Sequence, residues 1–222
     1  MRWKRFAALG LAAYLIALIS TLPAQFMLDW GPRWQMAGTL WSGEAVLDGA
    51  YRLSWRWAPL RSLAALAFAA DVRLDGSGTD ITGSVMARGR RLRFDGLSGR
   101  SDGALLAALD PALPFRCEVG LEIDLSRLII DGPYSSAVGE VRAGSGRCAA
   151  PGAATSALVP PLVAAIRTGP DDMTFGQLAP VGQGRLHLAE GSIADGRLTV
   201  SLTPAGRAAL PFMGDFRIDQ PL

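Results

Sequence analysis

The first thirty residues constrain this chain more than any other segment. Three cations within the first five residues precede an apolar run that extends from Phe6 to Leu28 with a few polar interruptions. A helix rises about 1.5 Å per residue, so this stretch reaches roughly the 30 Å of a bilayer's hydrocarbon. Basic residues before such a helix favour a cytoplasmic N-terminus. We therefore predict a cytoplasmic tip over residues 1–5, a single transmembrane helix over 6–28 in the inner membrane and a periplasmic domain over 29–222.

A cleaved signal peptide is the alternative for the same segment, because a charged start and a short apolar region precede Leu22-Pro23-Ala24. Leu22 occupies the −3 position of the cleavage site, where signal peptides have a small residue. Hydrophobicity also resumes at Phe26, and Trp30 and Trp34 are placed as interfacial anchors. Retention is therefore the preferred interpretation, and both alternatives place the following domain outside the cytoplasm.

Length and charge limit what that domain can be. The chain has 222 residues, half of them apolar, which suffices for one membrane segment and one domain with a hydrophobic core. Its 22 basic and 20 acidic residues leave a net charge of +2, and they are spread along the chain. Because no long basic face is available to neutralise phosphates, nucleic acid is not an expected partner.

From Trp34 onward, the pattern is typical of short strands separated by glycine-containing turns. Alternation is clearest in Tyr51–Trp57 (YRLSWRW), and acidic-glycine pairs such as Asp95-Gly96 and Glu190-Gly191 favour reversals. The fold prediction is mainly β: an antiparallel, twisted sheet with a few short helices. The strand candidates are residues 40–47, 51–57, 67–74, 81–87, 92–94, 117–123, 137–143, 186–188, 193–202 and 215–218.

Capping signals predict two short helices. Ser101-Asp102 precedes 103–109, and Thr203 precedes Pro204–Leu210. A third candidate, 156–167, contains Pro160-Pro161 and would be broken or begin late. The small and polar residues around it suggest a seam between two β subdomains near 150–172.

The two cysteines, Cys117 and Cys148, are predicted to form a disulfide in an oxidising periplasm. Two unrelated buried thiols are the alternative. We predict no metal site, because two cysteines and one histidine, His187, lack the spacing of a ligand set.

No motif indicates catalysis, a cofactor or a small-molecule substrate. His187 lies in an alternating stretch without a nucleophile elbow, and the clusters GSGTD and GSGRC lack the spacing and the lysine of a phosphate loop. Glu118, Glu122 and Asp124 share one side of a strand pattern, which is typical of a solvated face with Val119, Leu121 and Ile123 in the core. The prediction is a protein that is not an enzyme.

Three tryptophans form a candidate contact for a protein partner. Trp55 and Trp57 fall on one face of the same strand pattern, close to Trp41, while Arg52 and Arg56 fall on the other. Core packing is the simpler explanation. Tryptophan and arginine are also favoured at interface hot spots, so a partner contact stays open.

The segment Gly38–Ala45 (GTLWSGEA), a short distance after an anchor ending in Leu22-Pro23-Ala24, resembles the type II secretion system protein N family. The continuation LSWRWAPL, Leu53–Leu60, resembles it as well. The resemblance covers roughly the first hundred residues. It implies a non-catalytic, single-pass inner-membrane protein whose periplasmic domain assists the export of folded proteins and contacts other secretion subunits.

A lipid-handling protein of the AsmA-like kind is the alternative function. In that case a curved sheet would hold acyl chains against an apolar inner face, and the repeated hairpins are compatible with both functions. A continuous apolar surface lined by alternate strand residues would favour lipid. A filled core with exposed sheet edges would favour a scaffold that binds partners by β-augmentation.

Overall fold

A computed structural model describes residues 33–153, 155–169, 171 and 173–221, with Phe6, Gly10, Leu11, Tyr14, Ala17, Thr21, Pro23 and Ala24. Among these residues, no helix combines the length and the apolar character needed to cross a membrane. The predicted transmembrane helix falls mostly outside the described residues and stays a prediction there. At its downstream end, Pro23 forms a β-bridge with Thr39 and Ala24 is buried beside Trp55, so these two residues belong to the folded domain and not to a span that reaches Leu28.

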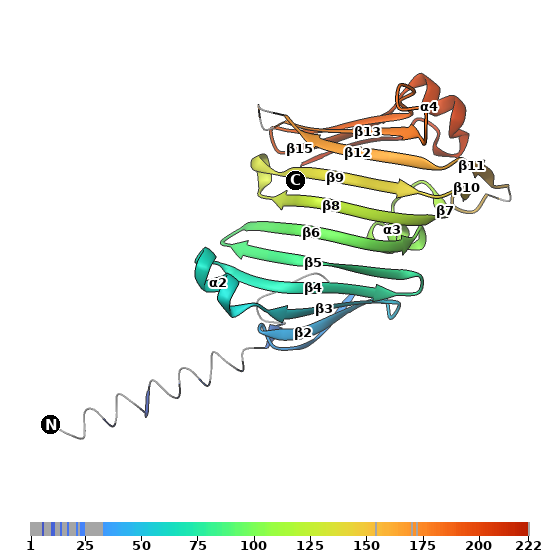
Figure 1. Cartoon of the computed structure of the whole chain (residues 1–222). Helices are drawn as coiled ribbons and strands as arrows, with labels where there is room; N and C mark the ends of the chain where they lie inside the picture. The colour runs from blue at the N-terminus through green and yellow to red at the C-terminus, as the bar shows by residue number, and fades with distance from the viewer. Residues whose placement is uncertain are drawn as a thin grey trace.

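The described chain is mainly β (Figure 1). Its strands are β1 (Trp34–Gly38), β2 (Ser42–Leu47), β3 (Tyr51–Trp57), β4 (Phe68–Gly76), β5 (Thr79–Arg88), β6 (Arg91–Asp102), β7 (Arg116–Glu118), β8 (Gly120–Ile130), β9 (Ser136–Ala143), β10 (Gly146–Ala149), β11 (Ala157–Val159), β12 (Leu162–Thr168), β13 (Thr174–Pro180), β14 (Ala189–Ala194), β15 (Arg197–Leu202) and β16 (Arg217–Pro221). Its helical segments are α2 (Pro59–Ala65), α3 (Ala104–Leu109), η2 (Gly132–Tyr134), α4 (Pro204–Ala209) and η3 (Pro211–Met213).

Among the described residues, thirteen strands form one antiparallel meander in the order β1-β2-β3-β4-β5-β6-β8-β9-β12-β13-β14-β15-β16. Each strand therefore pairs with its neighbours in this succession, and the sheet continues directly from β9 to β12 across the predicted seam. Three short strands, in the order β11-β10-β7, form a second sheet. Two connections of the meander supply them: β7 follows α3 between β6 and β8, and β10 and β11 lie between β9 and β12.

Most predicted strands are confirmed, with Tyr51–Trp57 correct at both ends. Two turn predictions are wrong. Asp95-Gly96 lies inside β6 and Glu190-Gly191 inside β14, because these strands are paired on both sides and run through the glycines. Residues 186–188 form no strand: Leu188 makes single hydrogen bonds to Leu178 and Thr203 instead of joining a ladder.

The helix predictions divide in the same way. Helix α4 begins after Thr203, whose Oγ1 accepts a hydrogen bond from the Gly206 backbone N–H at 3.0 Å, as predicted. Helix α3 is also present, but Gly103 is its N-cap and no side chain caps it. The helix expected over 156–167 is wrong, since β11 and β12 occupy that stretch and β12 pairs on both edges.

Candidate functional site: the inner face of the sheet

The register gathers the apolar side chains of the large sheet on one face, which we call the inner face. Directly paired residues of neighbouring strands point to the same side of a sheet. Leu53 pairs with Leu74, Val85 with Phe94, and Phe94 with Leu128. Over β3 to β15 this face carries Tyr51, Leu53, Trp55, Trp57, Phe68, Ala70, Val72, Leu74, Thr79, Ile81, Val85, Ala87, Leu92, Phe94, Leu97, Ser101, Leu121, Ile123, Leu125, Leu128, Ile130, Ala137, Val141, Ala143, Leu162, Ala164, Ile166, Thr168, Thr174, Leu178, Pro180, Ala189, Ile193, Leu198, Val200 and Leu202, with intervening glycines.

The charged side chains of the same strands lie on the opposite, outer face. There, arginines and carboxylates of neighbouring or alternate positions form solvent-accessible ion pairs, among them Arg52 with Glu44 at 3.2 Å and Arg73 with Asp80 at 3.1 Å. Exposed pairs of this kind contribute little stability, about 0 to 1 kcal/mol each. Their effect is to keep the outer face hydrated. Within the described chain, no charged residue stands on the inner face of β3 to β15.

One end of the inner face is covered. Leu105 of α3 is 3% exposed and packs with Leu47, Tyr51 and Ile81. Near β8, β12 and β15, the buried Leu188 and Leu210 belong to a second core cluster, against which η3 packs. We call this region, with the small sheet and α3 and α4, the disulfide end.

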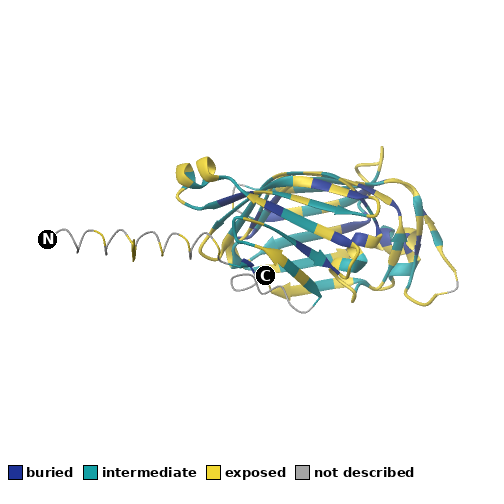
Figure 2. Cartoon of the chain, turned by 90° about the horizontal axis from the view of Figure 1, so that it is seen from below, coloured by how far each residue is buried: buried dark blue, intermediate teal, exposed yellow. Residues whose placement is uncertain are grey.

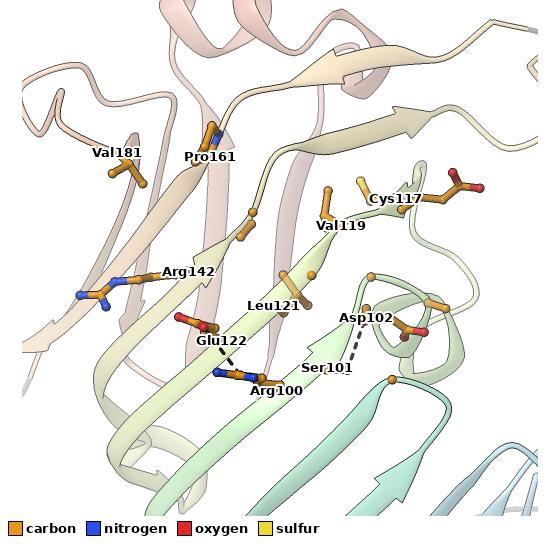
Figure 3. A pocket seen from close by; sticks show the side chains of 17 residues that line it. Arg100, Ser101, Asp102, Cys117, Val119, Leu121, Glu122, Arg142, Pro161 and Val181 are labelled. Atoms are coloured by element: carbon orange, nitrogen blue, oxygen red, sulfur yellow. Dashed lines mark hydrogen bonds and ion pairs between the residues drawn. The ribbon is translucent and has the colours of Figure 1, made fainter.

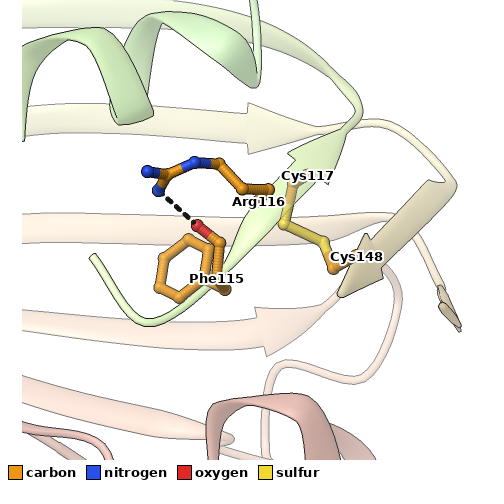
Figure 4. The surroundings of a disulfide bond; sticks show 4 residues. All are labelled: Phe115, Arg116, Cys117 and Cys148. Carbon is orange, nitrogen blue, oxygen red and sulfur yellow. Dashed lines mark hydrogen bonds between the residues drawn. A yellow bond between two sulfur atoms is a disulfide. The ribbon is translucent and has the colours of Figure 1, made fainter. Parts of the chain in front are cut away.

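The disulfide joins Cys117 of β7 to Cys148 of β10, as predicted. The two residues are direct partners in the small sheet, with Cα atoms 4.1 Å apart (Figure 4). Phe115, just before β7, packs edge-on against Phe212 and Phe216 at centroid distances of 6.4 and 6.0 Å. The disulfide therefore holds the segments that close this end of the inner face.

Over the middle strands the inner face stays partly exposed. The apolar residues here belong to none of the core clusters of the described chain, and one of them, Ile130, is 41% exposed. The others, of intermediate exposure, are Leu92, Phe94, Leu97, Leu125, Leu128, Val141, Ala164, Ile166, Ile193, Leu198 and Val200. Buried, exposed and intermediate residues are distinguished along the curved sheet in Figure 2. The ten strands from β3 to β15 in the large sheet, spaced about 4.8 Å apart, make the inner face about 43 Å long, measured along the sheet.

The tryptophans lie at the opposite end from the disulfide. Trp55 is 8% exposed and packs with Ala24, Ala45 and Ala70, so core packing is its role in the fold. Trp41 and Trp57 are partly exposed, and their rings meet edge-on at 4.7 Å. A partner contact through these two residues stays a prediction.

A cleft of about 980 Å³ opens at the disulfide end, between the adjoining ends of β6, β8, β9 and β12 (Figure 3). Four of its polar residues have partners within the protein. Ser101 Oγ lies 2.8 Å from Thr79 Oγ1, and Arg100 pairs with Glu122 at 3.7 Å. The Tyr51 hydroxyl donates to Asp102 at 3.3 Å, and burial raises the pKa of Tyr51, as does the Asp102 carboxylate. These contacts stabilise the cleft wall and align no nucleophile with a base.

The other candidate residues are dispersed. Glu118, Glu122 and Asp124 are exposed while Val119 and Leu121 are buried, as the strand pattern predicts. His187 lies in the loop before β14, where its imidazole nitrogens are 3.3 Å from Glu190 Oε1 and 3.1 Å from the Gly184 carbonyl. Within the described residues, no three His, Cys, Asp or Glu side chains are grouped to hold a metal ion.

Comparisons with protein-family models, curated proteins and solved structures found no match. The arguments about function therefore rest on the sequence and on the geometry of the sheet. Sequence analysis identified the alternation in single strands but did not show that one face stays apolar across the whole sheet. The signal was present in each strand, and the register was needed to join the strands.

Proposed function

We propose that this protein is a non-catalytic inner-membrane subunit of the type II secretion system, with its sheet in the periplasm. The main support for the proposal is that residues 38–43 (GTLWSG), on which the resemblance rests, form a tightly packed loop between β1 and β2. Gly38 adopts a φ of +96°, and a Cβ there would lie 2.7 Å from Gly43 Cα. The Trp55 indole donates to the backbone carbonyls of Thr39 and Leu40 at 3.2 and 3.1 Å.

The N-terminal segment contacts the same loop and the cluster beneath it. Pro23 forms an isolated β-bridge with Thr39, and Ala24 is 1% exposed in the cluster around Trp55. A motif at this place would connect a membrane anchor to the first hairpin of the sheet. This supports a role in which the sheet is held close to the membrane, where secretion subunits assemble.

Site-specific photocrosslinking from position 41 in cells tests the proposal. Trp41 is partly exposed, whereas Trp55 is buried and would report only on the core. The expected products contain other secretion subunits, and the matched control is position 158 in β11, which is 75% exposed at the disulfide end. Identical protein products from both positions, or no secretion subunit from position 41, would overturn the proposal.

A second candidate function is favoured by the partly exposed inner face: holding acyl chains. A lipid acyl chain spans about half of the 30 Å hydrocarbon thickness, which is shorter than the inner face along the sheet. Aliphatic side chains without charges offer such a chain an apolar surface, at about 25 cal/mol for each Å² removed from water. Glycines on this face, such as Gly176, leave space where no side chain projects.

Lipid that copurifies with the full chain, identified by mass spectrometry, tests this second function. Leu125→Asp places a charge in the middle of the inner face, and we expect it to reduce copurified lipid severalfold. Val138→Asp is the matched control, since Val138 is 37% exposed on the outer face of the neighbouring β9. Equal lipid in both variants and the parent chain would exclude the inner face as the binding surface.

A further inference from the structure

Helix α2 turns the polar Ser62 to the protein and its leucines to solvent. Ser62 is anchored: its Oγ accepts hydrogen bonds from Trp57 Nε1 at 2.8 Å and from the Ala69 backbone N–H at 2.9 Å. Leu60 and Leu63, one turn apart, are 82% and 71% exposed, and Leu66 at the C-cap is 81% exposed. A surface helix of a globular domain normally has the reverse arrangement. Exposed leucines grouped in this way indicate a surface that contacts something apolar.

The turn between β5 and β6 adds positive charge at the same end of the sheet, which we call the α2 end (Figure 1). It carries Arg88, Arg90 and Arg91, all exposed. Within the described residues, Arg88 and Arg90 have no ion pair, and Arg91 reaches Asp131 only at 3.8 Å. The three arginines therefore leave this turn positively charged.

The other charged residues near this turn and α2 change the net positive charge of this region little. Arg56 is exposed at the end of β3, next to α2. Arg61 of α2 is paired with Asp71. The turn between β14 and β15 contributes Asp195, and Asp171 and Arg167 lie at the turn between β12 and β13. The excess of arginine is therefore concentrated beside the exposed leucines.

We propose that α2 and the β5–β6 turn form a docking surface for a bilayer that contains anionic lipids. Leucines that enter the interface beside arginines that meet lipid phosphates are the two features by which a peripheral segment binds a membrane. The position of this surface agrees with the proposal. Pro23 bridges Thr39, and Ala24, within the predicted transmembrane stretch, packs beside Trp55 of β3, the strand that leads directly into α2.

The proposal rests on the proposed periplasmic location and adds an orientation to it. The α2 end would face the membrane, and the disulfide end would point away. The partly exposed part of the inner face includes Leu92 and Ile130, which are paired at the α2 end. It would then begin near the lipid surface.

Fluorescence quenching in vesicles tests this orientation with the full chain. The protein carries Leu63→Cys labelled with an environment-sensitive dye, and the lipids carry a headgroup-depth quencher. Vesicles contain phosphatidylcholine with or without phosphatidylglycerol. Leu158→Cys, at a residue 75% exposed in β11, is the matched control at the disulfide end. Neither substitution disturbs a core cluster of the described chain, so both variants are expected to fold.

We expect lipid quenching of the dye at position 63 and none at position 158. Adding Arg88→Gln and Arg90→Gln should weaken quenching in phosphatidylglycerol vesicles, with about a fivefold loss of surface affinity for each arginine. Equal quenching at positions 63 and 158 would overturn the orientation, and quenching independent of phosphatidylglycerol would overturn the role of the arginines. Either failure would leave the crosslinking result from Trp41 intact, so the two proposals fail separately.

Discussion

The two ends of the sheet bury their apolar residues differently. At the disulfide end, α3, the small sheet, α4 and η3 cover the inner face, and Leu188 and Leu210 are almost fully buried. At the α2 end, helix α2 turns its leucines outward, and inner-face residues such as Ile130 stay exposed. The buried cluster around Trp55 near the α2 end is instead completed by Ala24 of the N-terminal segment. The comparison shows that the same sheet pattern forms a closed core only where another segment of the chain folds back over it.

Truncating one leucine at each end sharpens the comparison most. Leu188→Ala should lower the free energy of unfolding by about 2 to 5 kcal/mol, because a fully buried side chain leaves a cavity. Leu63→Ala should change it by no more than about 0.5 kcal/mol, because that side chain is exposed. Denaturant unfolding followed by circular dichroism measures both. A large loss in Leu63→Ala would mean that α2 packs against another part of the protein.

Removing the disulfide should affect the covered end alone. The paired Cys117→Ala and Cys148→Ala substitutions release a loop with a sequence separation of 31 residues. The chain-entropy model gives a loss of about 3 to 4 kcal/mol. Hydrogen exchange should show faster opening around α3 and β10, with the amides of Trp57 and Ala70, at the α2 end, unchanged. Equal acceleration at both ends would show that they unfold as one unit.

Close packing at the first hairpin can be tested with a single methyl group. In Gly43→Ala the new Cβ would lie 2.5 Å from the Trp55 ring and 2.6 Å from the Ala37 carbonyl oxygen. Overpacking of this kind costs about 1 to 3 kcal/mol. Gly176→Ala is the matched control, since no atom lies within 4 Å of its Cβ position, and its effect should be neutral or stabilising by less than about 1 kcal/mol. Similar thermal midpoints for the two variants would contradict this account.

The smallest expected effect concerns acid stability at the disulfide end. Arg33 donates hydrogen bonds to Asp48 and, at 2.7 Å, to the Ala108 carbonyl of α3. The hydrogen bond from Arg33 lowers the pKa of Asp48 in the folded protein. Its contribution is therefore present above the ordinary aspartate pKa of about 4 and is lost as pH falls through the lowered value.

Asp48→Asn keeps a side chain that tolerates the positive φ of this position, 49°, and removes the titration. Thermal midpoints measured between pH 7 and pH 3 should fall less steeply in this variant than in the parent chain. An unchanged slope would show that the pair does not contribute to acid sensitivity.

Strand periodicity predicted much of the sheet because each strand buries one side. Tyr51–Trp57 alternates without interruption and was placed correctly. The helix predicted over 156–167 failed because most of its apolar residues belong to strand β12, which pairs with β9 on one edge and with β13 on the other, and the local pattern does not show these partners. Helix α2 was missed because its leucines do not face a core, which is the usual signal for a surface helix.

The candidate surface was harder to predict than the fold. Cys117 and Cys148 could be paired from their number and the predicted compartment alone. The continuity of the inner face depends on the register of many strand pairs, and the exposure of its middle depends on where α3 and α4 stop. Neither quantity is written in a single segment.

The meander order has a consequence for how the chain can be assembled. In the large sheet, each strand after β1 pairs on one edge with a strand that precedes it in the chain, so hairpins can be added one after another as the polypeptide emerges from its N-terminus onward. Such stepwise growth avoids waiting for remote partners, which slows the folding of many β proteins. Oxidation of Cys117 must wait until Cys148 has arrived. The disulfide would then form after β9 has joined the sheet, when the strands of the large sheet from β1 to β9 are already paired.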